Sequence, residues 1–382
     1  MKEVYEIAVV HGDGIGPEVC AATVEVVKAA LGPVNPLRFT EYPAGAEHFL
    51  KTGQSFPEPT FQACRAADAI LHGAGGLPGV VHPDGTEAGL DFTLRLRFEL
   101  DLYANIRPIR LFEGVPSPLS GVKAGDIDFI ILRENSEGLY AARGSGALLR
   151  GEVAVDTLVQ TRPGIERIVR KAFELARKSS GAPRDGVRRV TCCDKANVLR
   201  SYAFFRSVFD EVAKGYPDIA TEHALVDAMA MHLVLKPGHF NVIVSENMFG
   251  DILSDLAAAT VGGMGMAPSA EIGETNGFFQ AAHGSAPDIA GKGIANPYGT
   301  ILSAALMLDW LGHKHGDEKL NRAAGRIRRV TEDCLAGGLL SADLKGSAST
   351  HKIAHAVCDR LATVPGLSSH DQTGDDGGRD VR

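Results

Sequence analysis

The sequence lacks long hydrophobic runs and dense clusters of basic residues. No apolar run approaches the about 20 residues needed to cross a membrane, and the N-terminus MKEVYEIAVV enters a strand-like run without a signal-peptide pattern. Lys and Arg number 39 against 47 Asp and Glu, for a net charge of −8, which disfavours nucleic acid as the main partner. We therefore expect a cytoplasmic protein that binds neither membranes nor nucleic acid.

Cysteine motifs are also missing. The six cysteines show no CxxC or zinc-ligand spacing, so reduced, mostly structural thiols are expected. Hydrophobic residues make up 45% of the chain and charged residues 23%, as in globular proteins. A length of 382 residues exceeds one ordinary core and predicts two domains.

Strand-like and helical patterns alternate along the chain. EIAVVHGDGIGPEVCAATVEVVKAAL predicts a strand, a glycine turn and an amphipathic helix, and ADAILHGAGG predicts a second strand. Further strands, IDFIIL, RRVTCCD and FNVIVSEN, alternate with helices such as GIERIVRKAFELARK. This alternation predicts an α/β fold. The tail, residues 364–382, has few apolar residues and is expected to be disordered.

The first glycine turn departs from the dinucleotide-binding fingerprint. In GDGIGP, Pro17 stands where G-x-G-x-x-G requires its last glycine, so the ordinary Rossmann interpretation fails. Taken alone, the glycines predict only a tight turn into a helix, and a bound nucleotide must be held by other residues.

Three arginines are candidates for binding carboxylates. The segment LRLRFELDLYANIRP predicts a helix from about position 90 that ends before Pro108, which favours an extended Arg107. Arg133 ends the strand IDFIIL, where open α/β sheets bind ligands. Arg97 by itself fits a surface pair with Asp101. Together the three guanidinium groups would form a bidentate clamp.

Tyrosine and lysine supply candidate proton carriers. Tyr140 in RENSEGLY and Lys195 in CDKAN each follow a predicted strand, and both residue types transfer protons when a charged pocket shifts their pKa. In isolation each is more often a surface or packing residue. Asp227 lies in the apolar helix VDAMAMHL, where an unpaired charge would be costly.

Two further carboxylates lie one helical turn apart in NMFGDILSDL. Asp251 and Asp255 are at i and i+4, so their Cβ atoms lie roughly 5–6 Å apart. The helix dipole accounts for Asp251 near the start of the helix but not for Asp255 a turn later. A divalent cation, Mg²⁺ or Mn²⁺, bound by both carboxylates and by substrate oxygens accounts for the pair.

Seven motifs in order and spacing resemble the isopropylmalate/isocitrate dehydrogenase family of β-decarboxylating dehydrogenases. They are HGDGIGPE, LRFELDLYANIRP, RENSEGLY, DKANVL, VDAMAMHLV, NMFGDILSDL and HGSAPDIAGKGIANP, and the similarity continues to about position 361. The resemblance implies an isopropylmalate-dehydrogenase-like fold of two α/β domains without a Rossmann fingerprint. Residues 1–109 with 262–363 would form the nucleotide-binding domain, and 110–261 the substrate, metal and dimerisation domain. It also implies a homodimer with shared active sites.

The resemblance also assigns roles. It implies a substrate-carboxylate clamp of Arg97, Arg107 and Arg133. It implies metal ligation by Asp251, Asp255 and the partner's Asp227, and an acid–base pair of Tyr140 with the partner's Lys195. The cofactor would be NAD, bound by His283, Gly284, Ser285, Ala286, Asp288, Ile289 and Asn296. Asp288 would accept hydrogen bonds from the adenosine ribose hydroxyls and repel a 2′-phosphate.

Two departures from the family pattern concern the substrate. Gln280 stands where the family usually has Glu, which keeps hydrogen bonding and loses a charge. The specificity positions are Leu90, Thr93 and Leu94, and Glu87 lies a turn too early to match the usual glutamate. An apolar pocket with one hydroxyl favours 3-isopropylmalate or another 3-alkylmalate, and tartrate or D-malate is the alternative. A non-catalytic regulatory subunit is the alternative of another class.

Overall fold

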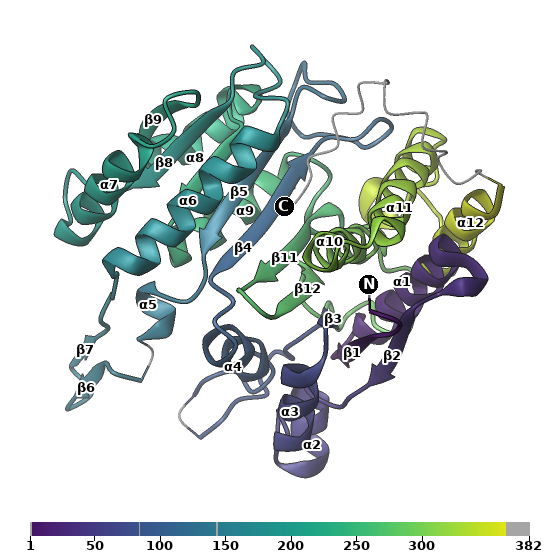
Figure 1. Cartoon of the computed structure of the whole chain (residues 1–382). Coiled ribbons are helices and arrows are strands. Elements are labelled where there is room, and N and C mark those ends of the chain that lie inside the picture. Colours follow the sequence, from purple (N-terminus) through teal and green to yellow (C-terminus); the bar gives the residue numbers. More distant parts are fainter. Residues whose placement is uncertain (1, 84, 143, 364–382) are drawn as a thin grey trace.

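The computed structural model describes residues 2–83, 85–142 and 144–363, so the predicted disordered tail lies outside the described residues. Its centre is one mixed sheet of ten strands in the order β2-β1-β3-β12-β11-β4-β5-β10-β8-β9, with helices packed on both faces (Figure 1). A separate pair, β6 and β7, projects from the body as a hairpin (Figure 1). The expected α/β fold is confirmed.

The strands alternate with helices as the sequence predicts. The strands are β1 Tyr5–Gly12, β2 Leu37–Glu41, β3 Ala69–Ala74, β4 Ala104–Arg110, β5 Asp128–Glu134, β6 Ala147–Leu149, β7 Val153–Val155, β8 Arg189–Asp194, β9 Ala220–Leu225, β10 Val242–Ser245, β11 Pro268–Ile272 and β12 Gly277–Ala281. The helices are α1 Gly16–Leu31, α2 Ala46–Thr52, α3 Glu58–Ala66, α4 Asp91–Glu99, α5 Gly138–Ala141, α6 Arg162–Lys178, α7 Arg200–Ala213, α8 Val226–Leu235, α9 Asn247–Ala259, α10 Tyr298–His315, α11 Glu318–Ala336 and α12 Thr350–Thr363.

The chain returns to the centre of the sheet late in the sequence. β12 pairs parallel with β3, and β11 pairs antiparallel with both β12 and β4. β4 in turn pairs antiparallel with β5. Strands from the last third of the chain therefore lie between β3 and β4. The division into 1–109 with 262–363 and 110–261 stays a prediction, because one continuous sheet includes strands of both parts.

The segment expected to be helical up to Pro108 divides into two elements. Helix α4 ends at Glu99, and Asp101 has a φ of 48°, a left-handed conformation that ends a helix and is uncommon outside glycine. Strand β4 then begins at Ala104 and includes Arg107, which is extended as predicted. The helix is therefore shorter than expected, and its last predicted residues belong to the central sheet.

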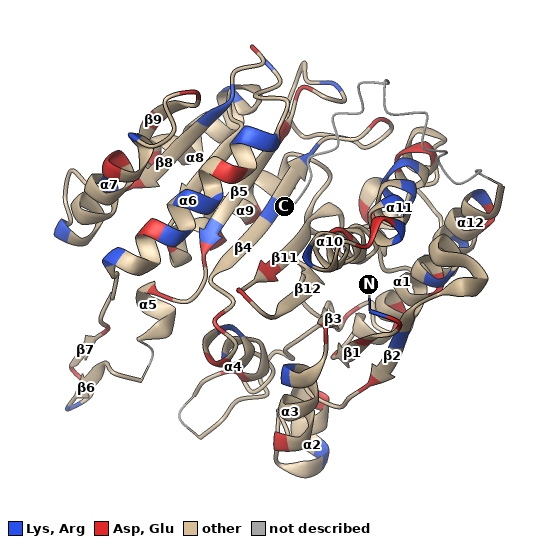
Figure 2. Ribbon diagram, viewed as in Figure 1, with Lys and Arg blue, Asp and Glu red and all other residues tan. Residues whose placement is uncertain are grey.

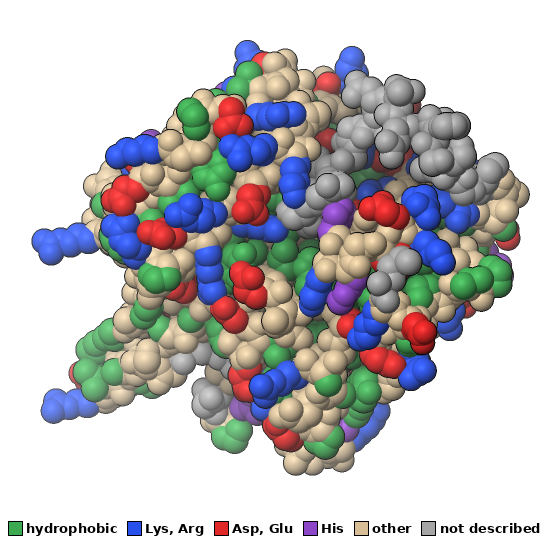
Figure 3. Space-filling view, viewed as in Figure 1, with side chains coloured by type: hydrophobic (Ala, Val, Ile, Leu, Met, Phe, Trp, Pro, Cys, Tyr) green, Lys and Arg blue, Asp and Glu red, His purple; other side chains and the backbone are tan. Residues whose placement is uncertain are grey.

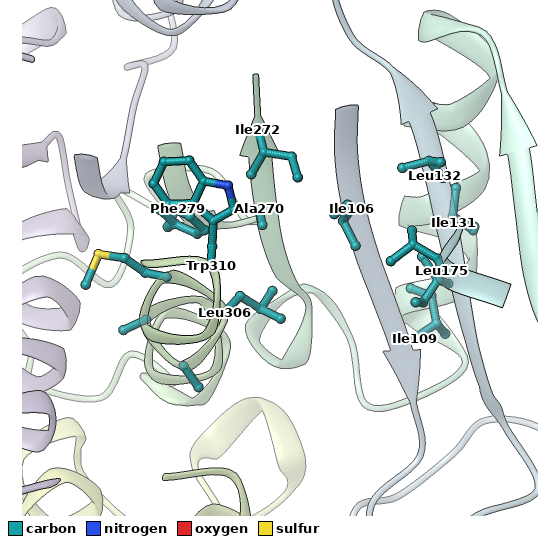
Figure 4. Close-up of a cluster of buried hydrophobic side chains, with 14 of the residues drawn as sticks. Ile106, Ile109, Ile131, Leu132, Leu175, Ala270, Ile272, Phe279, Leu306 and Trp310 are labelled. Carbon is teal, nitrogen blue, oxygen red and sulfur yellow. The ribbon is translucent and has the colours of Figure 1, made fainter. Parts of the chain in front are cut away.

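A hydrophobic core fills one side of the central strands. Ile106, Ala270 and Phe279 of β4, β11 and β12 point toward this core, where Phe279 packs near Trp310 of α10 at a ring separation of 5.8 Å (Figure 4). Helix α10 is buried along residues 298–312, as expected for a helix that is apolar on all sides. Phe279→Ala would cost about 3–5 kcal/mol of stability.

The opposite side of the same strands carries the polar residues. Successive side chains of a strand point to opposite faces, so Arg107, Glu271 and Gln280, the neighbours of the three core residues, face away from α10. All three lie within the strands that the core fixes in place. Burial of one face thus determines the position of the other.

The surface mixes charges of both signs. Lys and Arg alternate with Asp and Glu along α6 and α11 in this view (Figure 2). Within the described ranges, no helix is both long and apolar enough to cross a membrane. All six cysteines are free, and five of them are buried.

Candidate active site

A cavity of about 640 Å³ lies between α4, α5, α9 and the central strands. It brings together eleven residues that the sequence singles out: Leu90, Thr93, Leu94, Arg97, Arg107, Arg133, Tyr140, Asp251, Gln280, His283 and Gly284. The other lining residues are Gly75, Leu139, Asp156, Met248, Ala281 and Ala282. These six were not predicted to belong to the site, because no local pattern marks them.

Two of the arginines converge on Asp251. Arg133 is 1% exposed and donates from Nη1 to Asp251 and from Nε and Nη2 to Asn247 Oδ1, at 2.9 and 2.7 Å. Arg107 Nη2 lies 3.3 Å from Asp251 Oδ1, and its Nη1 lies 3.2 Å from Asp255 Oδ1. Arg107 Nε is buried without a hydrogen-bond partner among the described residues. Both guanidinium groups line the cavity, so the cavity presents positive charge to an anionic ligand.

Burial and charge act in opposite directions on these groups. Burial lowers the pKa of Arg133 to about 10, although Asp251 opposes that change. Burial acts to raise the pKa of Asp251, but the charges of Arg133 and Arg107 outweigh it and lower the pKa overall. Burial raises the pKa of Asp255, with Arg107 opposing. Asp251 is thus ionised and available as an oxygen ligand at neutral pH.

Arg97 has a different partner from the one expected. Its Nε and Nη2 each donate to the carboxylate of Glu271 at 2.7 Å, and Glu271 is 0% exposed. Asp101 instead accepts from Arg167 at 2.6 and 2.8 Å, so the surface pair between Arg97 and Asp101 is wrong. Glu271 was not predicted to belong to the site. One feature of the sequence could have indicated it: Glu271 is the single acidic residue in the apolar run MAPSAEIG. A charge buried in such a run is costly unless it is paired.

Tyr140 lies at the wall of the cavity on the short helix α5. Its hydroxyl donates to Asp251 Oδ2 at 3.3 Å, and the Arg133 guanidinium lies 5.5 Å from the ring centroid. Burial, followed by the charge of Asp251, raises the pKa of Tyr140. The phenol therefore keeps its proton at neutral pH and can donate it.

Lys195 and Asp227 lie elsewhere. Lys195 Nζ is 2.6 Å from Asp227 Oδ1, and neither residue lines the cavity. The Asp227 side chain is 66% exposed, so the expected apolar surroundings are wrong for the isolated chain: Asp227 lies in the first turn of α8, on its outer face. Within the described residues, no three His, Cys, Asp or Glu side chains gather as a metal site. Of the three expected metal ligands, Asp251 lines the cavity, and Asp255 lies one helical turn further along α9 without lining it.

The cavity also has apolar lining. Leu90, Leu94, Leu139 and Met248 contribute apolar side chains to it. Thr93 donates its hydroxyl hydrogen to Leu90 O at 2.8 Å, so that hydrogen is not available to a ligand. Glu87 precedes α4 and does not line the cavity.

The HGSAP segment borders this cavity and a second one. His283 and Gly284 line both, and the second cavity, of about 710 Å³, also includes Ala286, Ile289 and Asn296. Ser285 O accepts from Ile15 N at 2.8 Å. A Cβ on Gly14, whose φ is 59°, would lie 2.1 Å from that oxygen, so the glycine turn is required for close approach to the HGSAP segment.

Two predicted cofactor residues do not line the second cavity. Ser285 is buried and donates its hydroxyl hydrogen to Gly76 O. Asp288, three positions further along the same segment, is exposed. Asn296 does line the cavity and donates from Nδ2 to Asp343 at 3.0 Å. An elongated ligand that spans both cavities would contact most of the predicted cofactor residues.

Comparisons with known proteins agree with this arrangement. A family model for isocitrate/isopropylmalate dehydrogenase matches residues 6–357. The 3-isopropylmalate/3-methylmalate dehydrogenase of Methanocaldococcus jannaschii is 43% identical over 358 residues, which cover 94% of this chain and 99% of that protein. The D-malate dehydrogenase (decarboxylating) of Escherichia coli K12 is 40% identical over 368 residues, with 94% and 99% covered.

A solved structure shares the fold. The isocitrate dehydrogenase of Methylococcus capsulatus gives a TM-score of 0.82 at 36% identity, covering 94% of this chain and 100% of that chain. The predicted resemblance is confirmed, since the family model, the relatives and the solved structure all agree over nearly the whole length. This chain belongs to the isocitrate/isopropylmalate dehydrogenase family.

Proposed function

We propose that this protein catalyses the NAD- and divalent-metal-dependent oxidative decarboxylation of a 2-hydroxy diacid, with 3-isopropylmalate or another 3-alkylmalate as substrate. The observation that carries the proposal is one cavity lined both by three arginines and by the apolar side chains of Leu90, Leu94, Leu139 and Met248. The arginines suit the two carboxylates, and the apolar side chains suit an alkyl substituent. The 3-isopropylmalate/3-methylmalate relative supports this substrate class.

The chain's own residues would divide the chemistry as follows. The guanidinium groups bind and orient the diacid, and Tyr140, which holds its proton, protonates the carbon from which CO₂ leaves. In the shared site, Lys195 of the partner subunit accepts the hydroxyl proton of the substrate, directly or through water. Asp227 accepts a hydrogen bond from Lys195 in the isolated chain and would orient this amine.

The carboxylates fit a hard divalent cation. Asp251 and Asp255 present only oxygen donors on one side of α9, next to the cavity, and Mg²⁺ or Mn²⁺ prefers such ligands. We propose that they bind the ion together with Asp227 of the partner subunit. When bound, NAD accepts hydride and the cation stabilises the negative charge that develops on the substrate oxygen.

A homodimer with shared sites follows from the same proposal. Met231 and Leu235 of α8 and Ile252 of α9 are exposed apolar side chains, Leu235 to 70%. Apolar side chains gather on the projecting hairpin of β6 and β7 (Figures 1 and 3), where Leu148 is 75% exposed. Contiguous exposed apolar surface is typical of an interface, and α8 also carries Asp227. A partner packed on α8 and α9 would bring Asp227 and Lys195 toward Tyr140 of the other chain.

NAD, rather than NADP, is the cofactor we propose. Asp288 is exposed beside the second cavity, where its carboxylate can accept hydrogen bonds from ribose hydroxyls and would repel a 2′-phosphate. The free cysteines fit a reducing compartment, and we propose the cytoplasm.

Tartrate or D-malate is the second candidate substrate. The D-malate relative is 40% identical over nearly the whole chain, and the arginines would bind such a diacid equally well. The apolar side chains of the cavity would then favour a 3-alkylmalate over D-malate, since D-malate has no alkyl group to bury.

The test is NADH production from 3-isopropylmalate, D-malate, tartrate and isocitrate in parallel with Mg²⁺ supplied. We expect the highest kcat/KM for 3-isopropylmalate, because one buried methylene is worth about 1–3 kcal/mol of discrimination. A higher kcat/KM for D-malate or tartrate would favour the alternative. No NADH from any of the four would favour a non-catalytic regulatory subunit.

A further inference from the structure

We propose that Glu271 is a positioning residue that aims the guanidinium of Arg97 at a carboxylate of the substrate. The inference rests on the proposed function, because it concerns how the same cavity binds its diacid. Glu271 itself does not line the cavity. It acts through Arg97, which does.

The geometry divides the donors of Arg97 between two partners. The Glu271 carboxylate accepts hydrogen bonds from Nε and from one Nη2 hydrogen, both at 2.7 Å. These donors lie along the side edge of the planar guanidinium. Nη1 and the remaining Nη2 hydrogen are left at the other edge, and Arg97 lines the cavity. A planar group held along one edge can rotate little. Its free edge is therefore fixed as a second bidentate donor for a carboxylate.

Two further side chains hold Glu271 in place. Asn135 Nδ2 donates to Oε2 at 2.9 Å, and Gln280 Nε2 donates to Oε1 at 3.0 Å. Asn135 follows β5, Glu271 lies on β11 and Gln280 on β12. Each carboxylate oxygen thus accepts two hydrogen bonds, one from Arg97 and one from an amide. The network joins two strands and the residue that follows a third, and the carboxylate has little freedom to rotate.

The network also explains the amide at position 280. A glutamate there would place a second carboxylate about 3 Å from Glu271, and two such carboxylates cannot both be ionised. The amide donates to Glu271 instead of repelling it. Glu271 on β11 therefore supplies the single carboxylate of this network. Its hydrogen bond with Gln280 connects that carboxylate to the segment that leads to His283.

A different role for Glu271 makes the opposite prediction. If Glu271 only neutralised the buried charge of Arg97, its removal would leave Arg97 with more attraction for an anionic substrate. The substrate KM would then stay the same or fall. If Glu271 aims Arg97, the KM must rise even though the site becomes more positive.

The first test is the isosteric variant Glu271→Gln, with Glu274→Gln as the matched control. Glu274 is exposed, three positions further along the chain. We expect the KM for the best diacid to rise about tenfold in Glu271→Gln, since one charge-assisted hydrogen bond is lost. The KM for NAD and kcat should stay within about twofold, and Glu274→Gln should match the wild type. An unchanged or lower substrate KM in Glu271→Gln overturns the proposal.

A crystal structure of Glu271→Gln gives a second readout that does not need activity. We expect the Arg97 guanidinium to leave its present position. Arg97 in the same position would contradict the proposed role. If the wild type oxidises none of the four diacids, the proposed function is wrong, and this structure still decides the role of Glu271.

A second variant covers the case in which Glu271→Gln does not fold. Gln280 is partly exposed, and Gln280→Glu adds a carboxylate that competes with Glu271 for protons and for Arg97. We expect its substrate KM to rise, and the double variant Glu271→Gln/Gln280→Glu, with one charge again, to recover part of the loss. A Gln280→Glu enzyme with the wild-type KM would speak against the network.

Discussion

Lys195 and Asp227 form an ion pair of 2.6 Å outside the cavity that contains Tyr140 and Asp251. The two halves of the proposed acid–base and metal chemistry are thus separated within one chain. In the proposed homodimer, a second chain packed on the exposed apolar residues of α8, the helix that carries Asp227, would bring the two halves together.

Mixed dimers test whether the sites are shared. Tyr140→Phe and Lys195→Ala should each lower kcat about 10²–10⁴-fold, because each removes a proton carrier. Co-expression of both variants should restore roughly a quarter of wild-type activity, since half of the dimers are mixed and each has one site with both residues intact. The measurement is NADH formation by the purified mixture.

The control for this experiment is each variant expressed alone with two different tags. These dimers contain no intact shared site and should show no recovery. If the mixture is no more active than the separate variants, each chain contains its own complete site and the shared-site proposal is wrong.

Metal binding is expected to depend on Asp251 and Asp255. EDTA should abolish activity, and added Mg²⁺ or Mn²⁺ should restore it. Asp255→Asn should weaken Mn²⁺ binding at least about tenfold, since loss of even an indirect ligand contact costs that much. Mn²⁺ binding is measured by electron paramagnetic resonance with substrate present.

Asp333→Asn, an exposed residue of α11, is the matched control and should bind Mn²⁺ as the wild type does. Asp251→Asn is a less specific test of metal binding, because it would also weaken the ion pairs of Asp251 with Arg133 and Arg107. Full activity of thoroughly chelated protein would contradict the metal-dependent proposal.

Cofactor preference is expected to depend on Asp288. Asp288→Lys removes the acceptor for ribose hydroxyls and adds a donor for a 2′-phosphate, so the ratio of kcat/KM for NAD to that for NADP should fall at least about tenfold. Steady-state kinetics with both cofactors measure it. Asp359→Lys makes the same charge change on the exposed side of α12 and should leave the ratio unchanged. An unchanged ratio in Asp288→Lys would show that NAD selection lies elsewhere.

A buried imidazole predicts a loss of stability in mild acid. His72 Nδ1 donates to Val10 O at 2.7 Å, while Nε2 is buried without a partner among the described residues. Burial lowers the pKa of His72 to about 4 from an ordinary value of 6.5. Between these values the unfolded chain binds the proton and the folded protein does not. Stability should therefore decrease as the pH falls from 6.5 to 4, by at most about 3 kcal/mol from this residue.

Urea unfolding at equal protein concentration from pH 7.5 to 4.5 measures this effect. His72→Asn keeps a donor for Val10 but does not titrate, so its stability should fall less steeply over this range than that of the wild type. The variant should be less stable at neutral pH because the smaller side chain leaves space beside Phe92 and Phe278. His351→Asn, at an exposed imidazole, should keep the wild-type slope. Parallel curves for His72→Asn and wild type would contradict the prediction.

Local pattern predicted much of the site. Arg107 is extended before a proline, Arg133 ends a strand, and Asp251 lies one turn before Asp255, all as expected. Each of these depends on backbone geometry within a few residues, which the sequence encodes directly. The helix that was expected to continue to Pro108 ends at Glu99 instead, because the residues after it pair with β5 and β11 to complete the sheet.

The partner of Arg97 could not be predicted in this way. Glu271 is 174 positions further along the chain, on β11, which pairs with β4, the strand that follows the Arg97 helix α4. The nearby Asp101 was the simpler choice on helical spacing, and it pairs with Arg167 instead. Long-range pairs depend on sheet order, which one sequence does not reveal.

The sequence by itself determined the kind of chemistry: which arginines, carboxylates and proton carriers are available, and the α/β pattern that carries them. Only the tertiary structure decided which of these groups meet. It places Tyr140 and the arginines around one cavity, and it leaves Lys195 and Asp227 outside that cavity. The physical reason is that residue type and local spacing are properties of short segments, whereas a site is made by strands and helices that become neighbours when the chain buries its core.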